Sequence, residues 1–210
     1  MTAQLSDYIK LGEIEYQILE TTDYNMFRPE SLGLKPTHRS TICWRGFWCG
    51  YEIRDDELLL SELNINNEGD VYPVINGIEA LPPSTIKRVF NGGKVITDYS
   101  NFGHHKYENL MMPVCFSGKL LLGTERIKNW GNSGGIDKCW KYKVLKTMDF
   151  QDGKIVNVSD ESEFGKRIYQ TIVDNCTSKG CVDFFEEGRL EEMAESFEEK
   201  PWYILRKWRD

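Results

Sequence analysis

Arg45 has the clearest chemical potential in this chain, because it lies in the aromatic stretch "CWRGFWCGY" with no acidic residue beside it. A guanidinium group keeps its charge, and leaving it unpaired away from water is costly. It therefore needs a carboxylate, backbone carbonyl groups or an anionic ligand. The internal carboxylates that we consider as partners are Glu52, Glu62 and Asp98.

The alternative is a ligand-binding site built around the same arginine. In this interpretation Arg45 binds an anionic group, and Trp44, Trp48 and Tyr51 form aromatic walls around the ligand. The pattern predicts a small barrel with a cavity for a small anionic molecule.

A second candidate is Ser133, in the loop 131–135 with the sequence Gly-Asn-Ser-Gly-Gly. This loop is similar to the Gly-Asp-Ser-Gly-Gly nucleophile loop of chymotrypsin-like serine proteases, and His38 and Asp70 precede it in that family's chain order. Asn132 replaces the family's aspartate, and the residues around His38 differ from the family pattern. Glycine, asparagine and serine are also good turn residues. A hydrolase that uses Ser133 is therefore our third hypothesis.

The six cysteines and three histidines show no usual metal-ligand spacing, and no C-x-x-C motif occurs. We expect the cysteines to be mostly buried thiols, and we predict no metal site and no cofactor. Cys176 and Cys181 could pair only under oxidising conditions.

Acidic residues are concentrated near the end of the chain. The net charge is −7, and residues 160–199 alone hold twelve acidic and four basic residues. An acidic chain without a basic stripe is a poor nucleic-acid binder, so a basic protein is the partner that we expect. The proposed docking residues are Glu187, Glu191, Glu192, Glu195 and Trp202. The alternative is an ordinary solvated helix face.

The elements that must position these residues are mainly strands. Residues 42–53 alternate with a period of two and predict a central strand, Asp55 and Asp56 predict a turn, and residues 58–65 predict the returning strand. Asn76-Gly77 and Asp152-Gly153 are strong hairpin signals. The pattern indicates an α+β fold, with a predominantly antiparallel sheet or a partly open barrel of hairpins.

Helical periodicity appears mainly in the last quarter of the chain. It predicts two C-terminal helices, at about 161–174 and 186–199, and a shorter helix that begins at Ser84. We therefore divide the chain into a β-rich domain at 1–159 and an acidic helical segment at 160–210 packed on it.

The bulk composition is that of a globular chain, with 40% hydrophobic and 28% charged residues. No apolar run reaches the roughly 20 residues that a membrane helix needs, and the first residues do not resemble a secretion signal. We therefore expect a cytoplasmic protein that does not bind membranes. Its oligomeric state is not predicted.

The stretch from Trp44 to Leu60 carries the pattern W-R-G followed by E-I-x-D-x-x-L-x-L. This pattern resembles hairpins in bacterial hypothetical proteins of unassigned role. The resemblance covers about 20 residues and implies no activity.

A binding role is favoured over catalysis, because no paired carboxylates at a diagnostic spacing and no phosphate loop emerge from the sequence. Our first hypothesis is a non-catalytic inhibitor or immunity-type protein that docks a basic protein. The second is the anionic-ligand barrel around Arg45, and the third is the Ser133 hydrolase.

Overall fold

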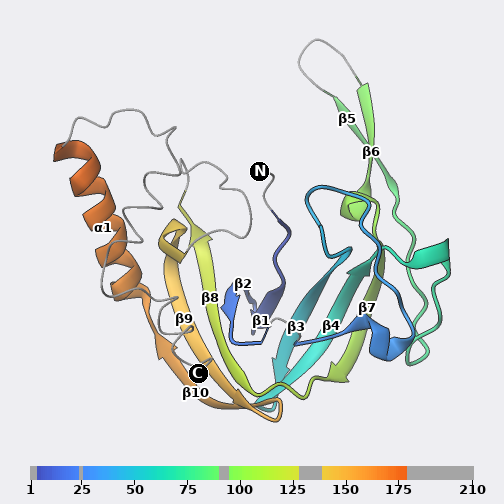
Figure 1. Cartoon of the computed structure of the whole chain (residues 1–210), viewed down its shortest axis with the longest axis horizontal. Coiled ribbons are helices and arrows are strands. Elements are labelled where there is room, and N and C mark those ends of the chain that lie inside the picture. The colour runs from blue at the N-terminus through green and yellow to red at the C-terminus, as the bar shows by residue number, and fades with distance from the viewer. Residues whose placement is uncertain (1–3, 24–25, 90–94, 128–138, 179–210) are drawn as a thin grey trace.

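The computed structural model describes residues 4–23, 26–89, 95–127 and 139–178 (Figure 1). The strands of this part of the chain are β1 (Tyr8–Leu11), β2 (Ile14–Thr21), β3 (Phe47–Arg54), β4 (Glu57–Ile65), β5 (Thr85–Val89), β6 (Val95–Tyr99), β7 (His105–Pro113), β8 (Gly118–Arg126), β9 (Tyr142–Gln151) and β10 (Lys154–Asp160). The helices are the α-helix α1 (Ser162–Ser178) and the short 3-10 helices η1 (Pro29–Leu32), η2 (Glu68–Asp70), η3 (Ser100–Gly103) and η4 (Cys139–Lys141).

Eight of these strands form one sheet in the order β10-β9-β8-β2-β1-β3-β4-β7, while β5 and β6 form a separate hairpin. Neighbouring strands of the sheet run antiparallel, except that β1 and β3 run parallel with Tyr8 opposite Gly50. The predicted predominance of antiparallel pairing is confirmed, and one parallel pair makes the sheet mixed.

The sheet bends into two arms that meet at one end and diverge at the other (Figure 1). One arm holds β8, β9 and β10, and the other holds β3, β4 and β7. At the closed end the Leu58 N–H donates to the Gly153 carbonyl at 2.8 Å, and the Ile155 N–H donates to the Asp56 carbonyl at 2.9 Å. These bonds join the tips of the β3–β4 and β9–β10 hairpins. The arrangement is compatible with the predicted partly open barrel.

The two hairpin tips are two-residue turns with left-handed backbone. Asp55 and Asp56 have φ of 51° and 62°, and Asp152 and Gly153 have φ of 49° and 81°. Such turns match the twist of the strands that they join, and aspartate and glycine adopt this conformation more readily than most residues. Both predicted turns are confirmed.

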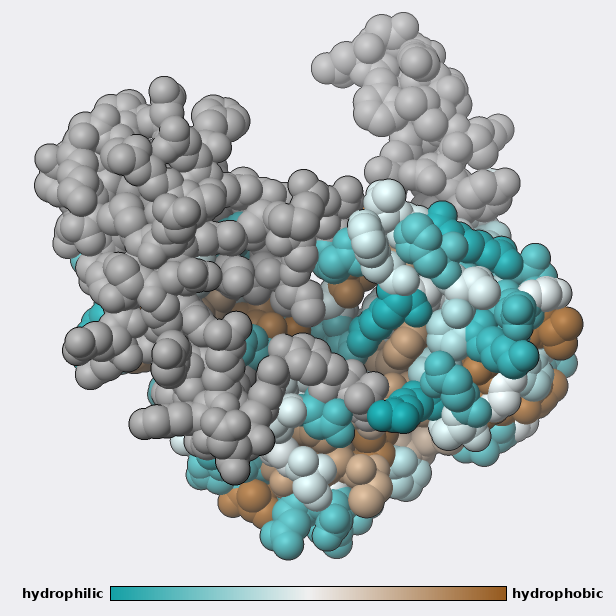
Figure 2. All heavy atoms as spheres, in the orientation of Figure 1, coloured by the Kyte–Doolittle hydropathy of each residue, from teal (hydrophilic) through white to brown (hydrophobic). Residues whose placement is uncertain are grey.

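The apolar core fills the space between the arms, and it combines side chains from both of them. On the face shown in Figure 2, hydrophilic residues cover much of the arm with β3, β4 and β7, and apolar residues appear between them. Burying each large apolar side chain contributes about 1.5–3 kcal/mol. The fully buried members of the core are Ile9, Leu34, Cys49, Leu60, Leu63, Ile65, Tyr107, Leu120 and Leu122.

Helix α1 packs against the opposite face of β8 and β9, where Ile168 joins Leu121 and Leu145 in a second apolar cluster. The Asp160 carboxylate accepts the N–H of Ser162 at 2.8 Å and so caps the helix start. The first predicted C-terminal helix is confirmed, and the second, at 186–199, lies outside the described residues. Among the helices that are described, none has the length and apolarity required to span a bilayer.

The prediction of a short helix that begins at Ser84 is wrong, because residues 85–89 form strand β5. This strand pairs with β6 from Thr85 opposite Tyr99 to Val89 opposite Val95. β-Branched residues favour the extended backbone, and the pairing satisfies its hydrogen bonds. The i, i+3 apolar spacing was therefore a misleading signal.

Candidate functional site

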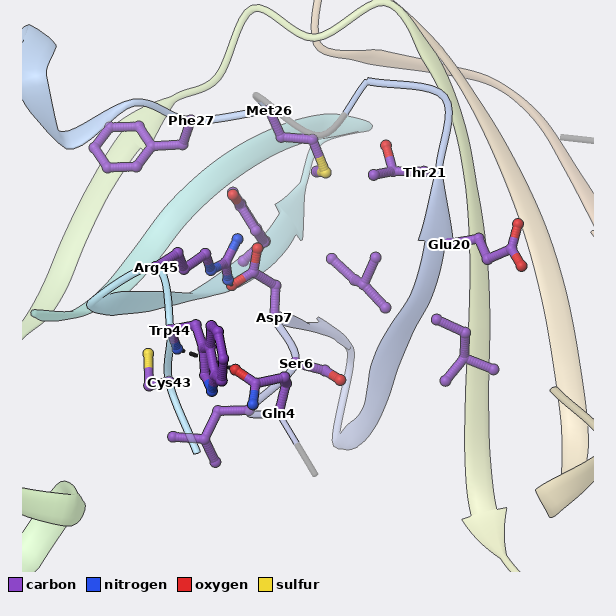
Figure 3. Close-up of a pocket in the computed structure, with 14 residues that line it drawn as sticks. Gln4, Ser6, Asp7, Glu20, Thr21, Met26, Phe27, Cys43, Trp44 and Arg45 are labelled. Atoms are coloured by element: carbon purple, nitrogen blue, oxygen red, sulfur yellow. Dashed lines mark hydrogen bonds and ion pairs between the residues drawn. The ribbon is translucent and has the colours of Figure 1, made fainter. Parts of the chain in front are cut away.

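A pocket of about 300 Å³ opens beside the short strand β1 (Figure 3). The chain before β1 passes between β2 and the loop that precedes β3. The Asp7 carbonyl accepts the Ile18 N–H of β2 at 2.8 Å. The Leu5 N–H donates to the Ile42 carbonyl of the loop before β3, also at 2.8 Å. The pocket walls come from residues 4–7, the end of β2 and the loop at 43–45, together with Met26, Phe27 and Tyr51.

Arg45 lies in the turn that precedes β3, and the sequence prediction that placed it inside a strand is wrong. Gly46 causes the difference, since its φ of 77° belongs to the left-handed region. A Cβ atom at Gly46 would also lie 2.6 Å from the Thr37 carbonyl oxygen. The extended backbone therefore begins only at Phe47.

The guanidinium of Arg45 forms an ion pair with Asp7. Its Nε–H donates to the Phe47 carbonyl at 2.8 Å, and its Cζ lies 4.6 Å from the centre of the Phe47 ring. Asp7 Oδ1 also accepts the Cys49 N–H at 2.6 Å. An internal carboxylate is therefore the partner of Arg45, but it is not one of the three that the sequence suggested.

The charges of this pair are balanced. The Asp7 side chain is 13% exposed and the Arg45 side chain 39%. Burial acts to lower the pKa of Arg45, but the charge and hydrogen bond of Asp7 outweigh it and raise that pKa, so the ion pair persists. Burial raises the pKa values of Cys43, Cys49 and Tyr51, which keeps all three uncharged at neutral pH.

Asp7 is held in place by its neighbour Tyr8. The Tyr8 ring lies over Gly50, where a Cβ atom would be 2.5 Å from the ring, and the Tyr8 hydroxyl donates to Glu62. Burial and this hydrogen bond raise the pKa of Tyr8, so the phenol stays protonated. Lys106 Nζ lies 2.5 Å from Glu62 and 2.8 Å from Glu108. This network fixes β1 against β3 and β4.

Three of the four residues proposed for the ligand site line this pocket. Trp44 is 69% exposed, and its backbone N–H and indole N–H donate to Gln4 and to the Thr41 carbonyl. Tyr51 is buried in the pocket wall. Figure 3 shows Arg45 directed toward Asp7, with Trp44 beside the pair.

Trp48, the fourth proposed residue, contributes to a different pocket of about 560 Å³. Its ring makes an edge contact with His104, with the ring centres 4.7 Å apart. Tyr8, Gln17 and Arg126 also line this second pocket. The segment 4–6 borders both pockets and separates them.

His104 makes the stability of the fold depend on pH. Its side chain is fully buried, and Nδ1 lies 3.1 Å from the Asn101 carbonyl oxygen. Burial lowers the pKa of His104, and burial also lowers that of the neighbouring His105. The folded state therefore binds fewer protons than the unfolded state once pH falls below the unfolded value of about 6.5.

We expect the free energy of unfolding to fall by about 1 kcal/mol from pH 7.5 to pH 5.5, and less in a His104→Gln variant. Urea unfolding at the two pH values measures this difference. His38→Gln, at an exposed position, is the matched control and should keep the full loss. If His104→Gln lost as much unfolding free energy between the two pH values as the wild type, His104 would not be the source of the pH dependence.

Asp7 is the functional residue that sequence reasoning missed. It stands 38 positions before Arg45, and its approach depends on the parallel pairing of β1 with β3. Alternating hydrophobicity identifies a strand but not its neighbour in the sheet. No local signal in the sequence marks Asp7 as the partner of Arg45.

Several sequence predictions concern residues outside the described part of the chain, and they stay predictions. Ser133 belongs to this group, so the proposed triad stays a prediction. Of its other members, Asp70 is paired with Arg39 at 2.6 Å. The other residues of this group are the predicted docking residues Glu187, Glu191, Glu192, Glu195 and Trp202.

Comparisons of the chain with protein-family models, with curated proteins and with solved structures gave no match. The resemblance of residues 44–60 to bacterial hypothetical proteins therefore stays a prediction. Any function must be argued from the geometry of the site itself.

Proposed function

We propose that this protein is a non-catalytic small-molecule-binding protein and that its ligand occupies the pocket beside Asp7 and Arg45. The observation that carries this proposal is a hydrogen-bonded ion pair in the wall of a pocket otherwise lined largely by apolar and aromatic side chains. Ligand sites commonly combine an apolar lining with a few well-placed polar groups, in volumes of about 300–1,000 Å³.

Different groups around the pocket would contact different parts of a ligand. Ile18, Met26 and Trp44 offer apolar contact to the body of a ligand, while Arg45 and Asp7 offer a donor and an acceptor to its polar end. The pair is anchored by the Phe47 carbonyl and the Cys49 N–H. Anchored polar groups lose little conformational freedom when a ligand binds, which favours affinity.

Substitution of the exposed Trp44 tests whether ligands bind in this pocket. We expect Trp44→Ala to weaken the binding of pocket ligands about tenfold, because removing an aromatic wall costs roughly 1–2 kcal/mol of contact. Ligands would be found by a fragment screen with thermal-shift detection, and their affinities measured by isothermal titration calorimetry.

Phe102→Ala is the matched control for this substitution. Phe102 is also an exposed aromatic residue, at 51%, and it does not line this pocket. It should leave the affinities unchanged. The proposed function would be overturned if the screen yielded no fragment that binds Trp44→Ala more weakly than the wild type while binding Phe102→Ala with unchanged affinity.

The docking of a basic protein by the acidic C-terminal segment remains our alternative proposal. It depends on residues outside the described ranges, so the geometry of this pocket does not bear on it. Retention of a basic partner at low salt and its release at high salt would support that alternative.

A further inference from the structure

The Asp7–Arg45 pair leaves one donor group and one acceptor atom without a hydrogen-bond partner among the described residues. A guanidinium has five N–H donors, and among the described residues only Nε and Nη2 of Arg45 have hydrogen-bond partners. Asp7 Oδ1 accepts two hydrogen bonds, while Oδ2 has no partner in the described part of the chain and is not closed off from solvent. Two contacting side chains that line the same pocket therefore still have hydrogen-bonding capacity, Arg45 as a donor through Nη1 and Asp7 as an acceptor through Oδ2.

The local charge opposes ionic ligands. An anion bound to Arg45 would lie beside the Asp7 carboxylate, and a cation bound to Asp7 would lie beside the guanidinium. Glu20 also lines the pocket and adds negative charge, although its side chain points away from the pair (Figure 3). The thiol of Cys43 is uncharged and does not change this balance.

We infer that the pocket selects neutral ligands with an amide-type group, whose carbonyl oxygen accepts from Arg45 and whose N–H donates to Asp7. Amides, lactams, ureas and the edges of nucleobases have this adjacent acceptor and donor. This inference rests on the proposed function, and it replaces the anionic ligand that the sequence suggested with a neutral one. The apolar remainder of such a ligand would lie against Met26 and Trp44.

Three probes with the same phenyl body test the inference by calorimetry: phenylacetamide, phenylacetate and phenethylamine. The wild-type protein should bind the amide about tenfold more tightly than either ion, because each ion can form a hydrogen bond with only one of the two groups and leaves the other without a partner.

Two substitutions should move the preference in opposite directions. Asp7→Asn leaves the arginine charge unbalanced, so phenylacetate should become the tightest of the three probes. Arg45→Gln leaves the aspartate charge, so phenethylamine should become the tightest. In the double variant both positions are neutral, so phenylacetamide should again bind most tightly of the three probes. If Asp7→Asn does not fold, Arg45→Gln and the double variant still carry the comparison.

The outcomes separate this inference from the proposed function. Tighter binding of phenylacetate by the wild type would overturn the inference while leaving a small-molecule pocket in place. An amide preference that neither substitution changes would also overturn it, because recognition would then lie elsewhere. Binding of none of the three probes, when the fragment screen still yields pocket ligands of other classes, would overturn it as well.

Discussion

Gly153→Ala is expected to lower the free energy of unfolding by about 3–4 kcal/mol, of which roughly 1–2 kcal/mol is the cost of left-handed backbone and the rest is steric overlap. Gly153 has φ of 81°, and a Cβ atom there would overlap the Val114 carbonyl oxygen. The residue also joins the two arms, since its carbonyl accepts from Leu58 and its N–H donates to Phe116. Chemical denaturation of the purified variant measures the loss.

Gly77→Ala is the matched control, because it separates the two causes. Gly77 follows Asn76 as Gly153 follows Asp152, and its φ of 78° is nearly the same, but a Cβ atom there would meet nothing within 4 Å. It should lower the free energy of unfolding by only about 1 kcal/mol. Equal losses in the two variants would show that the contact at the closed end contributes nothing.

The second large effect is expected at Gly46, which shapes the turn that holds Arg45. Gly46→Ala should lower the free energy of unfolding by about 3 kcal/mol, because alanine would combine left-handed strain with a clash against backbone that cannot move away easily. The clashing atoms belong to Thr37 and lie 2.6–2.8 Å from the ideal Cβ position. Denaturation gives the energy, and the affinity of a pocket fragment shows whether Arg45 is displaced.

Gly33 provides the comparison for this substitution. Its φ is 73°, close to the 77° of Gly46, and a Cβ atom there would also meet nothing within 4 Å. Gly33→Ala should therefore lower stability by about 1 kcal/mol and leave fragment affinity unchanged. If Gly46→Ala also retained full affinity, the turn would not be what positions Arg45.

Local sequence signals predicted the hairpins well, because the requirement for positive φ restricts which residues can form a tight turn. Asp55-Asp56 and Asp152-Gly153 are examples, and α1 followed from its apolar spacing. Where several local signals competed, the prediction failed. Residues 42–46 have the alternating hydrophobic pattern of a strand, yet they form a turn. Gly46 adopts a left-handed backbone conformation, and the hydrophobic pattern does not indicate it.

The candidate site was only partly predictable. The need of Arg45 for a negative partner follows from elementary electrostatics, and the structure provides that partner. Its identity as Asp7 depends on the parallel neighbours β1 and β3, a long-range property that periodicity does not encode. Trp44 and Trp48 were grouped by their spacing, but the turn before β3 directs them to different pockets.

Balanced charge at Asp7 and Arg45 changes what the pocket is expected to recognise. An unpaired arginine would favour anions, whereas the ion pair presents a donor and an acceptor at nearly zero net charge. We therefore expect the proposed pocket to distinguish ligands by hydrogen-bond pattern rather than by charge. The paired substitutions of Asp7 and Arg45 make that distinction measurable.

The most direct test of the account is a titration of the ¹⁵N-labelled protein with phenylacetamide, followed by NMR of the side-chain N–H groups. We predict that the Trp44 indole N–H and the Arg45 Nε–H signals shift together and saturate, while the Trp48 indole signal stays in place. Unchanged Trp44 and Arg45 signals at saturating ligand, or a shift confined to Trp48, would contradict the assignment of this pocket as the binding site.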